Sequence, residues 1–464
     1  MNDLQSEGIK KQKSKRVDML NGSILDKLLF FALPLAASSV LQQLFNSVDM
    51  AVVGKFASSQ AQAAVGCNGP VINLILTLFI GISVGANVVI ARYIGENRKN
   101  RINASVHTSM LVAIISGFIV LFVGLLVSRG ILVWMNTPED VLEHAVLYLK
   151  IYFLGVPFMM VYNFGAAILR SIGDTKRPLY CLGLAGVINA ALNMILVIIF
   201  HLGVAGVAIG TVVSNMITSS IVVYLLIHEE GDIKLSLREL RISVHELKRI
   251  LRMGLPAGLQ SVVFSIANVF IQASLNGYGS DAVAGSAVTL NYECYSYFIV
   301  SAFAQTAVTF TSQNFGAKKY DRCKKIFIQT ISISILVSWG MALCFVFGRE
   351  FFISLFTSES EVARYASIRM VHLLSFYCLV STYEVTGGAL RGMGYSMTPT
   401  IITVFGTCVL RLIWIATVCK WYTGFEILMN VYPVSWALTG LTVIVSYLAI
   451  RKRVFNEDEL EYIK

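Results

Sequence analysis

Hydrophobic residues fill long blocks of this chain, and short polar segments separate the blocks. About 20 apolar residues in helical form are enough to cross the hydrocarbon core of a bilayer. The blocks are apolar around their whole circumference, which favours a helical bundle over a membrane β-barrel. We therefore predict an all-α membrane protein with twelve transmembrane helices, over residues 28–53, 65–94, 103–127, 141–168, 179–200, 205–227, 252–276, 283–314, 325–347, 362–389, 398–419 and 430–450.

The twelve predicted spans form two sets of six, because the sequence repeats at an offset of 221 residues. One half contains Tyr162, Leu169, Arg170, Gly173 and Pro178, and the other contains Tyr383, Leu390, Arg391, Gly394 and Pro399. Six is an even number, so both halves insert in the same orientation and are related by a pseudo-two-fold axis along the membrane normal. This arrangement is typical of an alternating-access transporter that binds its substrate between two lobes.

The polar segments divide the chain into five parts. We predict a cytoplasmic N-terminal tail at 1–27, an N-terminal six-helix lobe at 28–227, a cytoplasmic linker at 228–251, a C-terminal six-helix lobe at 252–450 and a cytoplasmic C-terminal tail at 451–464. A basic amphipathic stretch from Leu235 to Arg252 predicts that the linker ends in a helix on the cytoplasmic surface.

The composition excludes several other classes of protein. Hydrophobic residues make up 56% of the chain and charged residues only 14%, whereas a soluble domain carries about 25% charged residues. This scarcity of charge excludes a soluble enzyme, a disordered chain and a collagen-like fibre. The eight cysteines have no C-x-x-C pair and no histidine at metal-binding spacing, so we expect small apolar side chains rather than disulfides or metal ligands.

The net charge of +10 would suit a nucleic-acid-binding protein, but its distribution indicates membrane topology instead. Of the 37 lysines and arginines, 29 lie on one side of the twelve-span topology. The positive-inside rule assigns that side, with both termini, to the cytoplasm. We therefore expect a multi-pass protein of the plasma membrane, surrounded by lipids and without a nucleic-acid partner. Trp134, Trp421 and Trp436 lie near span ends, where aromatic residues anchor helices at the interface.

Acids inside the apolar spans are the first candidates for function, because a charge in a membrane is costly unless it is paired or used. Asp49 lies in the first span beside Gln43 and Asn46, which make this helix face polar. We interpret Asp49 as a carboxylate that binds a cation or a proton, and the alternative is an acid at the outer interface. Glu293 and Glu384 are further candidates, although Glu293 could simply be hydrated at the outer mouth.

One arginine lies deep in the eleventh predicted span. An unpaired arginine there is improbable, so Arg411 should have a carboxylate partner, and Glu384 is our first candidate for it. Glu384 could instead form a structural pair with Arg391 or serve as a functional acid, and these alternatives stay open.

Amide and hydroxyl side chains supply a second group of candidates. Asn189 and Asn193 are four residues apart and share one helix face of the fifth span, and Thr211 adds an oxygen in the sixth. Asn163 is the repeat mate of Glu384. Such groups either bind an ion or hold helices together by hydrogen bonds. Candidates for the wall of a substrate cleft are Gln43, Asn46, Gln260, Asn268, Glu293, Tyr383, Glu384 and Arg411.

Motifs for nucleotide chemistry and hydrolysis are missing from the sequence. It contains no G-x-x-x-x-G-K-[ST], no H-E-x-x-H and no G-x-S-x-G. We therefore expect no enzyme activity and no cofactor. Transport should be driven by an ion gradient or by another subunit.

Four local patterns resemble the multidrug and toxic compound extrusion (MATE) family, and the resemblance covers essentially the whole chain. They are Leu33-Pro34 followed by Val48-Asp49 and Gly54, the run from Leu169 to Pro178, its second copy from Leu390 to Pro399, and Gln313-Asn314-Phe315-Gly316-Ala317. The resemblance implies two six-helix lobes around a V-shaped cleft that opens alternately to each side. It also implies export of cationic amphipathic drugs or toxins in exchange for H+ or Na+. We expect the transporter to be a monomer.

The resemblance further implies a coupling site. The family's first-helix aspartate falls on Asp49, and its polar partners fall on Asn163, Asn189 and Thr211. Many relatives have an aspartate where this chain has Asn193, which leaves Asp49 as the only clear acid in the N-terminal spans. The coupling ion stays open, because a carboxylate with amide oxygens serves both H+ and Na+.

Two other functions compete with drug efflux. A related flippase or exporter of a lipid-linked or endogenous metabolite would need a cleft rich in basic residues, and among deep positions only Arg411 qualifies. A membrane-embedded enzyme or receptor would need a polar reactive cluster in one lobe or a large soluble domain, and neither is evident in the sequence.

Overall fold

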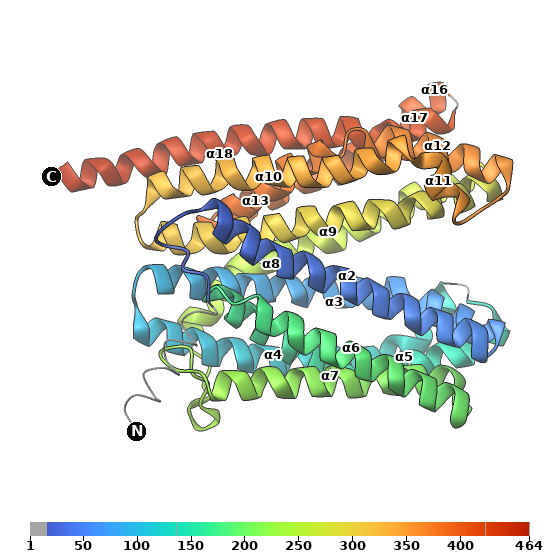
Figure 1. Cartoon of the computed structure of the whole chain (residues 1–464), viewed down its shortest axis with the longest axis horizontal. Helices are drawn as coiled ribbons and strands as arrows, with labels where there is room; N and C mark the ends of the chain where they lie inside the picture. Colours follow the sequence, from blue (N-terminus) through green and yellow to red (C-terminus); the bar gives the residue numbers. More distant parts are fainter. Residues whose placement is uncertain (1–15, 136, 423, 464) are drawn as a thin grey trace. The chain divides into compact units, whose positions relative to one another are not determined.

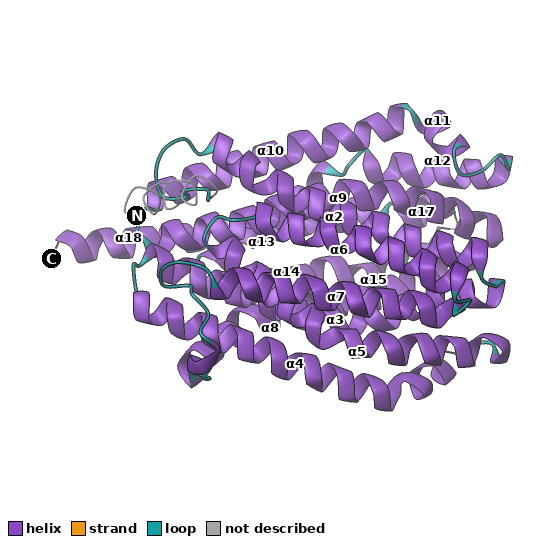
Figure 2. Ribbon diagram, turned by 60° about the horizontal axis from the view of Figure 1, so that its bottom comes forward, coloured by secondary structure: helices purple, strands orange, loops and turns teal. Residues whose placement is uncertain are grey.

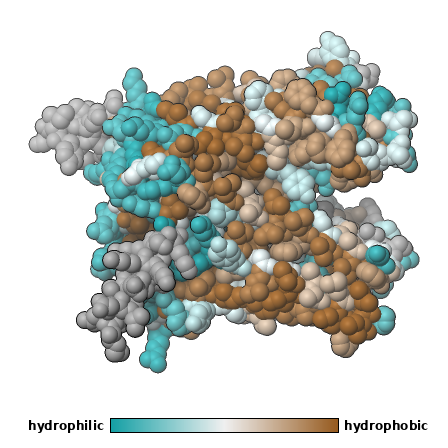
Figure 3. Space-filling view, viewed as in Figure 1, coloured by the Kyte–Doolittle hydropathy of each residue, from teal (hydrophilic) through white to brown (hydrophobic). Residues whose placement is uncertain are grey.

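The computed structural model of the chain describes residues 16–135, 137–422 and 424–463 and, within these ranges, contains helices and loops but no strand (Figure 2). Most of the predicted N-terminal tail lies outside the described residues. Ten of the described helices are long and apolar enough to cross a membrane. Hydrophilic residues gather at helix ends and hydrophobic ones along the middle (Figure 3), as a bilayer requires. The predicted all-α membrane fold is confirmed.

The first half of the chain forms six spans, drawn from blue to green in Figure 1. They are α2 (Leu25–Phe56), α3 (Ser59–Gly95), α4 (Lys99–Trp134), α5 (Glu139–Ser171), α6 (Lys176–Met194) with its π-helical continuation η1 (Ile195–Ile199), and α7 (Gly203–Ile227). The linker that follows contains one short 3-10 helix, η2 (Leu237–Glu239).

The second half repeats this order with more interruptions. Its spans are α8 (Val244–Asn276), α9 (Ser280–Gly316), α10 (Tyr320–Phe347), α12 (Ser360–Leu374) with α13 (Cys378–Gly392), α14 (Met397–Thr403) with the π-helix η3 (Val404–Val409) and α15 (Leu410–Ala416), and α18 (Val431–Ile463). Short helices α11 (Arg349–Ser354), α16 (Val418–Trp421) and α17 (Phe425–Met429) connect them. The predicted tail at 451–464 is largely the end of α18.

Two of the twelve predicted spans are not among the ten apolar helices. The predicted span 283–314 is α9, which is rich in buried hydroxyl and amide side chains. Several of these hydroxyls donate to carbonyl groups one turn earlier, as Thr306 does to Ala302 and Ser312 to Val308, both at 2.7 Å, which satisfies them within the helix. Ser286, Ser296 and Thr311 are buried without a hydrogen-bond partner among the described residues. The predicted span 362–389 is broken between α12 and α13.

The chain folds into two compact units, and each takes a segment from the other half of the sequence. The N-terminal unit comprises residues 33–258 together with the segment before Met19, and the C-terminal unit comprises 19–32 and 259–464. The first turns of α2 therefore belong to the C-terminal unit, and the first four turns of α8 belong to the N-terminal unit. This boundary differs from the predicted lobes at 28–227 and 252–450.

The predicted surface helix from Leu235 to Arg252 is wrong for its first half. The backbone N–H of Ser236 bonds to His107 Nε2 at 3.1 Å, and that of Ser243 to Thr108 Oγ1 at 3.0 Å. These bonds tie the linker to α4, so α8 begins only at Val244. The linker is thus a strap on the N-terminal unit.

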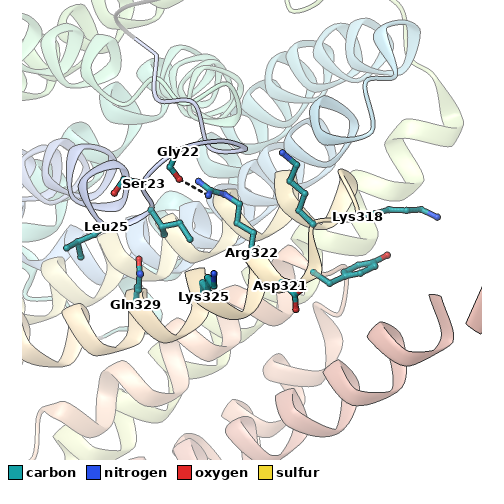
Figure 4. A pocket seen from close by; sticks show the side chains of 11 residues that line it. Gly22, Ser23, Leu25, Lys318, Asp321, Arg322, Lys325 and Gln329 are labelled. Carbon is teal, nitrogen blue, oxygen red and sulfur yellow. Dashed lines mark hydrogen bonds between the residues drawn. The ribbon is translucent and has the colours of Figure 1, made fainter. Parts of the chain in front are cut away.

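The C-terminal unit has a matching strap, formed by residues 19–24 over the turn between α9 and α10. Arg322 donates to the carbonyl groups of Met19, Asn21 and Gly22 at 2.8–3.1 Å, and Figure 4 shows its side chain reaching Gly22. Lys319 Nζ donates to Leu20 O at 2.9 Å. The surface pocket between strap and turn has a volume of about 680 Å³. Lys319 and Arg322, which line this pocket, hold the strap in place through these hydrogen bonds.

Candidate functional site

The carboxyl group of Asp49 is buried in the N-terminal unit, where α2 meets α6. Only 9% of the residue is exposed. Asn193 Nδ2 donates to Asp49 Oδ1 at 2.5 Å. The hydrogen-bond network orients the Asn189 amide so that its nitrogen donates to the same oxygen at 2.9 Å. Two neutral amides, and no basic side chain among the described contacts, therefore hold the carboxylate.

Helix geometry and small residues bring this group together. Asn189 and Asn193 lie one turn apart on α6, so both amides face α2. A Cβ atom at Gly210 would overlap Asn193 Oδ1, and one at Gly186 would overlap the ring of Phe45. Glycine at these positions lets α7 and α2 approach the amide-bearing face of α6.

Other residues expected at this site lie at or beyond its edge. Thr211 takes part through its backbone N–H, which donates to the Asn189 amide oxygen at 3.2 Å, while its hydroxyl donates to Val207 O at 3.0 Å. Asn163 donates to Met159 O in its own helix at 2.9 Å. Gln43 is half-buried and Asn46 is exposed on α2. The structure thus brings Asp49, Asn189 and Asn193 into contact and leaves Asn163 out of this network.

A carboxylate in this setting can change its charge at low structural cost. It accepts hydrogen bonds from neutral donors, so protonation or binding of one cation neutralises the only formal charge in the cluster. Asn193 Oδ1 is buried without a hydrogen-bond partner among the described residues. This carbonyl oxygen is a ready second ligand for a bound cation.

The C-terminal unit contains a second polar site, a cavity of about 350 Å³. Four of the predicted cleft residues line it: Asn268, Glu293, Tyr383 and Arg411. The other four do not: Gln43 and Asn46 belong to α2 in the N-terminal unit, Gln260 accepts a hydrogen bond from Arg391 Nη2 at 2.8 Å, and Glu384 is outside the lining. The sequence-based list therefore divides into residues of this cavity and residues elsewhere.

The expected pairing of Arg411 with Glu384 is wrong. Arg411 Nε donates to Ser435 Oγ at 3.1 Å, and its guanidinium carbon lies 4.6 Å from the centroid of the Tyr432 ring. No ion pair within the described part of the chain joins Arg411 to an acid. The ring of Tyr432 and the hydroxyl of Ser435, both on α18, therefore hold this arginine in place of an acid.

Arg369 was not among the predicted cleft residues, and it forms an ion pair with Glu293 in the wall of the cavity. Arg369 Nε and Nη2 donate to the two carboxylate oxygens of Glu293 at 2.7 and 3.1 Å. The sequence could have indicated Arg369, because a basic residue inside the predicted span 362–389 is as unusual as Arg411 inside the span 398–419.

Trp436 also differs from prediction: it is buried beside the cavity, whereas Trp134 and Trp421 are exposed.

The model of the MatE family matches the chain twice, over residues 34–195 and 256–417. The chain belongs to the MATE family. The two matches begin at Pro34 and Pro256, which confirms the internal repeat. MATE-family proteins are transporters, and this chain is a bacterial-type multidrug efflux transporter with many membrane-spanning helices.

Similar proteins span nearly the whole chain. The probable multidrug resistance protein YoeA of Bacillus subtilis is 28% identical over 446 residues, covering 93% of this chain and 95% of its own. The probable multidrug resistance protein NorM of Thermotoga maritima is 26% identical and covers 84% of each chain. A crystal structure of a MATE protein in the bent conformation has a TM-score of 0.88 at 22% identity, covering 95% of this chain and 98% of that one. That likeness shows the MATE fold.

Proposed function

We propose that this MATE protein is a secondary-active antiporter, which exports cationic amphipathic compounds in exchange for H+ or Na+ by alternating access. The observation that carries the proposal is the Asp49 carboxylate, buried in the N-terminal unit and held by the amides of Asn189 and Asn193. The proposal includes a monomer in the plasma membrane with both termini in the cytoplasm and no cofactor.

Coupling follows from the single charge at this site. One carboxylate among neutral groups can hold a proton, a metal cation or an organic cation, but two positive charges there would repel each other. If ion binding changes the arrangement of α2 and α6, it lowers the affinity of the transporter for its cargo. By linkage, cargo binding then weakens ion binding to the same extent.

Transport of ethidium in proteoliposomes tests this proposal. A pH or sodium gradient is imposed on vesicles that contain the wild type, Asp49→Asn or Asp281→Asn. Asp281 is an exposed acid at the start of α9 and serves as the matched control. We expect at least one gradient to drive ethidium movement with the wild type and the control, and an ionophore for that ion to abolish it. Asp49→Asn should reconstitute equally well and lose gradient-driven transport. Wild-type rates with Asp49→Asn, or no response to either gradient, would refute the proposal.

One observation supports a second candidate, a flippase or exporter of a lipid-linked or endogenous metabolite. The C-terminal unit buries Arg369 and Arg411 around one cavity, and basic side chains of this kind suit anionic cargo. The same vesicles separate the two functions. Ethidium movement that an ionophore abolishes supports the antiporter, and an absence of ethidium movement at any gradient supports the metabolite exporter.

A further inference from the structure

The cavity of the C-terminal unit is walled by α8, α9, α12, α13, α15 and α18. All its lining residues belong to that one unit. Its volume of about 350 Å³ is in the lower part of the range of small-molecule sites. Six aromatic side chains line it: Phe264, Tyr297, Tyr377, Tyr383, Tyr432 and Trp436. The cavity therefore has the size and the lining to accept a planar aromatic compound.

The wall of this cavity carries a net positive charge. Its charged residues are two arginines and one glutamate. Both carboxylate oxygens of Glu293 accept hydrogen bonds from Arg369, so the charges of these two residues cancel. Arg411 is left without an acidic partner among the described residues. The pair and the single arginine together give a formal charge of +1.

Arg411 is also incompletely hydrogen-bonded, although it is fully buried. Its Nε atom reaches Ser435, but Nη1 and Nη2 have no acceptor within the described structure. The rings of Tyr432 and Phe264 lie 4.6 and 5.6 Å from its guanidinium carbon, and each contact is worth about 0.5–2 kcal/mol. Burial of an unpaired cation costs several kcal/mol, and an anionic partner would supply stabilisation that these rings and the serine hydroxyl do not.

A second unpartnered group lies in the same wall. Ser286 Oγ is buried without a hydrogen-bond partner among the described residues and lines the cavity. The two free guanidinium nitrogens of Arg411 form a planar fork, which fits the two oxygens of a carboxylate. A ligand with a carboxylate would therefore satisfy donors that the chain itself leaves unsatisfied.

The internal repeat relates this cavity to the Asp49 site. The offset is 222 in the first helix of each half and 221 further on, so Asp49 corresponds to Ile271 and Thr211 to Tyr432. Ile271 and Tyr432 both line the cavity. Arg411 comes one residue after the position that corresponds to Asn189. The C-terminal unit thus has an apolar side chain at the position equivalent to Asp49 and a basic side chain next to the position equivalent to Asn189.

We infer that this cavity binds the anionic end of an aromatic carboxylate, with the carboxylate against Arg411 and the ring among the tyrosines. As a cargo site it extends the substrates to anionic and zwitterionic aromatic compounds, and that role rests on the proposed export function. Binding itself does not depend on transport. The aromatic lining distinguishes this ligand from a small inorganic anion, which would leave most of the cavity wall without a contact.

Isothermal titration calorimetry on the full-length protein in detergent tests the inference. The probes are 2-naphthoate, the neutral 2-naphthamide and the cationic 2-naphthylmethylammonium, which share one ring system. We expect the wild type to bind the carboxylate at least about tenfold more tightly than the other two. This comparison needs no variant, so it stands even where a substitution impairs folding.

Two substitutions of Arg411 and two control variants assign the binding to this residue. Arg411→Gln should weaken 2-naphthoate binding at least about tenfold, and Arg411→Lys, which keeps the charge but loses the fork, should weaken it less. Arg364→Gln is the matched control, since it removes an exposed arginine of α12 in the same unit, and it should leave binding unchanged. Asp49→Asn should also bind 2-naphthoate normally while losing ion-driven transport.

The outcomes separate the two proposals. Equal binding of the three probes, unchanged affinity in a folded Arg411→Gln protein, or a response to chloride but not to 2-naphthoate would overturn the anion site and leave the Asp49 antiporter intact. Specific 2-naphthoate binding without gradient-driven ethidium transport would instead refute the antiporter and leave the anion site standing.

Discussion

At the scale of single residues, the buried charges of this protein are stabilised in three different ways: amide groups hold Asp49, a carboxylate holds Arg369, and a ring face holds Arg411. The sequence shows where such charges lie but not which groups stabilise them. Asp49 stands out because acids are rare in the apolar blocks, and helix periodicity alone places Asn189 and Asn193 on one face. The partners of Arg411 and Arg369 depend on which helix packs against which. That information is non-local, so the sequence suggests the wrong partner for Arg411 and does not reveal the Arg369–Glu293 pair.

The Arg369–Glu293 ion pair should contribute strongly to stability. Both side chains are nearly buried, with 7% and 13% of their surface exposed. Glu293→Gln leaves the Arg369 cation buried without a counter-charge, which costs about 3–5 kcal/mol for a buried pair. We expect a clear fall in the thermal unfolding midpoint of the purified protein in detergent.

An exposed pair in the same unit is the control for this prediction. Glu361 and Arg364 on α12 are linked at 2.9 Å with more than half of each side chain exposed, and such a pair is worth about 0–1 kcal/mol. Glu361→Gln should therefore leave the unfolding midpoint almost unchanged. Similar shifts for Glu293→Gln and Glu361→Gln would show that burial does not set the strength of these pairs.

At the scale of helices, the N-terminal unit depends on a close crossing between α3 and α8. Gly81 and Gly85 on α3 face Gly254 and Gly258 on α8. A Cβ atom at Gly85 would lie 2.5 Å from the backbone nitrogen of Gly254. Small residues spaced by four let two helix backbones approach within van der Waals contact. The pattern is visible in the sequence, but only the structure shows that these two helices are the ones that meet.

Gly85→Ala should disrupt this crossing. The added methyl group meets backbone atoms of Ile250 and Gly254, which cannot rotate away as a side chain could. Overpacking of this kind costs about 1–3 kcal/mol, while alanine gains about 1 kcal/mol of helix propensity over glycine. The steric cost is larger, so we expect a lower unfolding midpoint and reduced ethidium transport.

Gly66→Ala on the same helix should have the opposite effect. A Cβ atom at Gly66 would meet the methyl group of Met50 at 3.8 Å, which is an ordinary van der Waals contact, so the gain in helix propensity remains and stability should hold or rise. Equal destabilisation by both substitutions would mean that flexibility of α3, rather than its contact with α8, requires glycine.

Interruptions of helices were the least predictable feature at this scale. The turns η1 and η3 and the break between α12 and α13 lie inside continuous apolar runs. Hydropathy sets the position of a span, whereas its local winding follows from contacts with neighbouring helices. Hydropathy is also an incomplete guide to the spans themselves. Helix α9 occupies the position of a predicted span although its buried polar side chains keep it out of the group of ten apolar helices.

At the scale of the whole molecule, the repeat predicted two six-helix lobes, and the structure adds an exchange of segments. Residues 19–32 join the C-terminal unit, and the linker with residues 244–258 joins the N-terminal unit. Two anchors hold these segments. Glu246 accepts hydrogen bonds from Tyr93 and Arg101 at 2.8 Å, and Phe31 packs edge-on against Phe310 with ring centroids 5.4 Å apart. A repeat in sequence cannot reveal such an exchange, because each anchor joins residues from distant parts of the chain.

The exchange predicts that two separately expressed halves of the protein associate stably. A cut after Gly231 falls at an exposed position of the linker with open space around it, and each resulting half lacks a segment that its unit takes from the other. An affinity tag on the fragment 1–231 should therefore recover the fragment 232–464 from a detergent extract.

Phe31→Ala in the first fragment removes a fully buried ring, a change that costs about 3–5 kcal/mol, and it should reduce recovery. Phe30→Ala removes the same ring from a position that is 59% exposed and should not. Failure to recover the second fragment, or equal losses with both substitutions, would show that the exchanged segments do not hold the halves together.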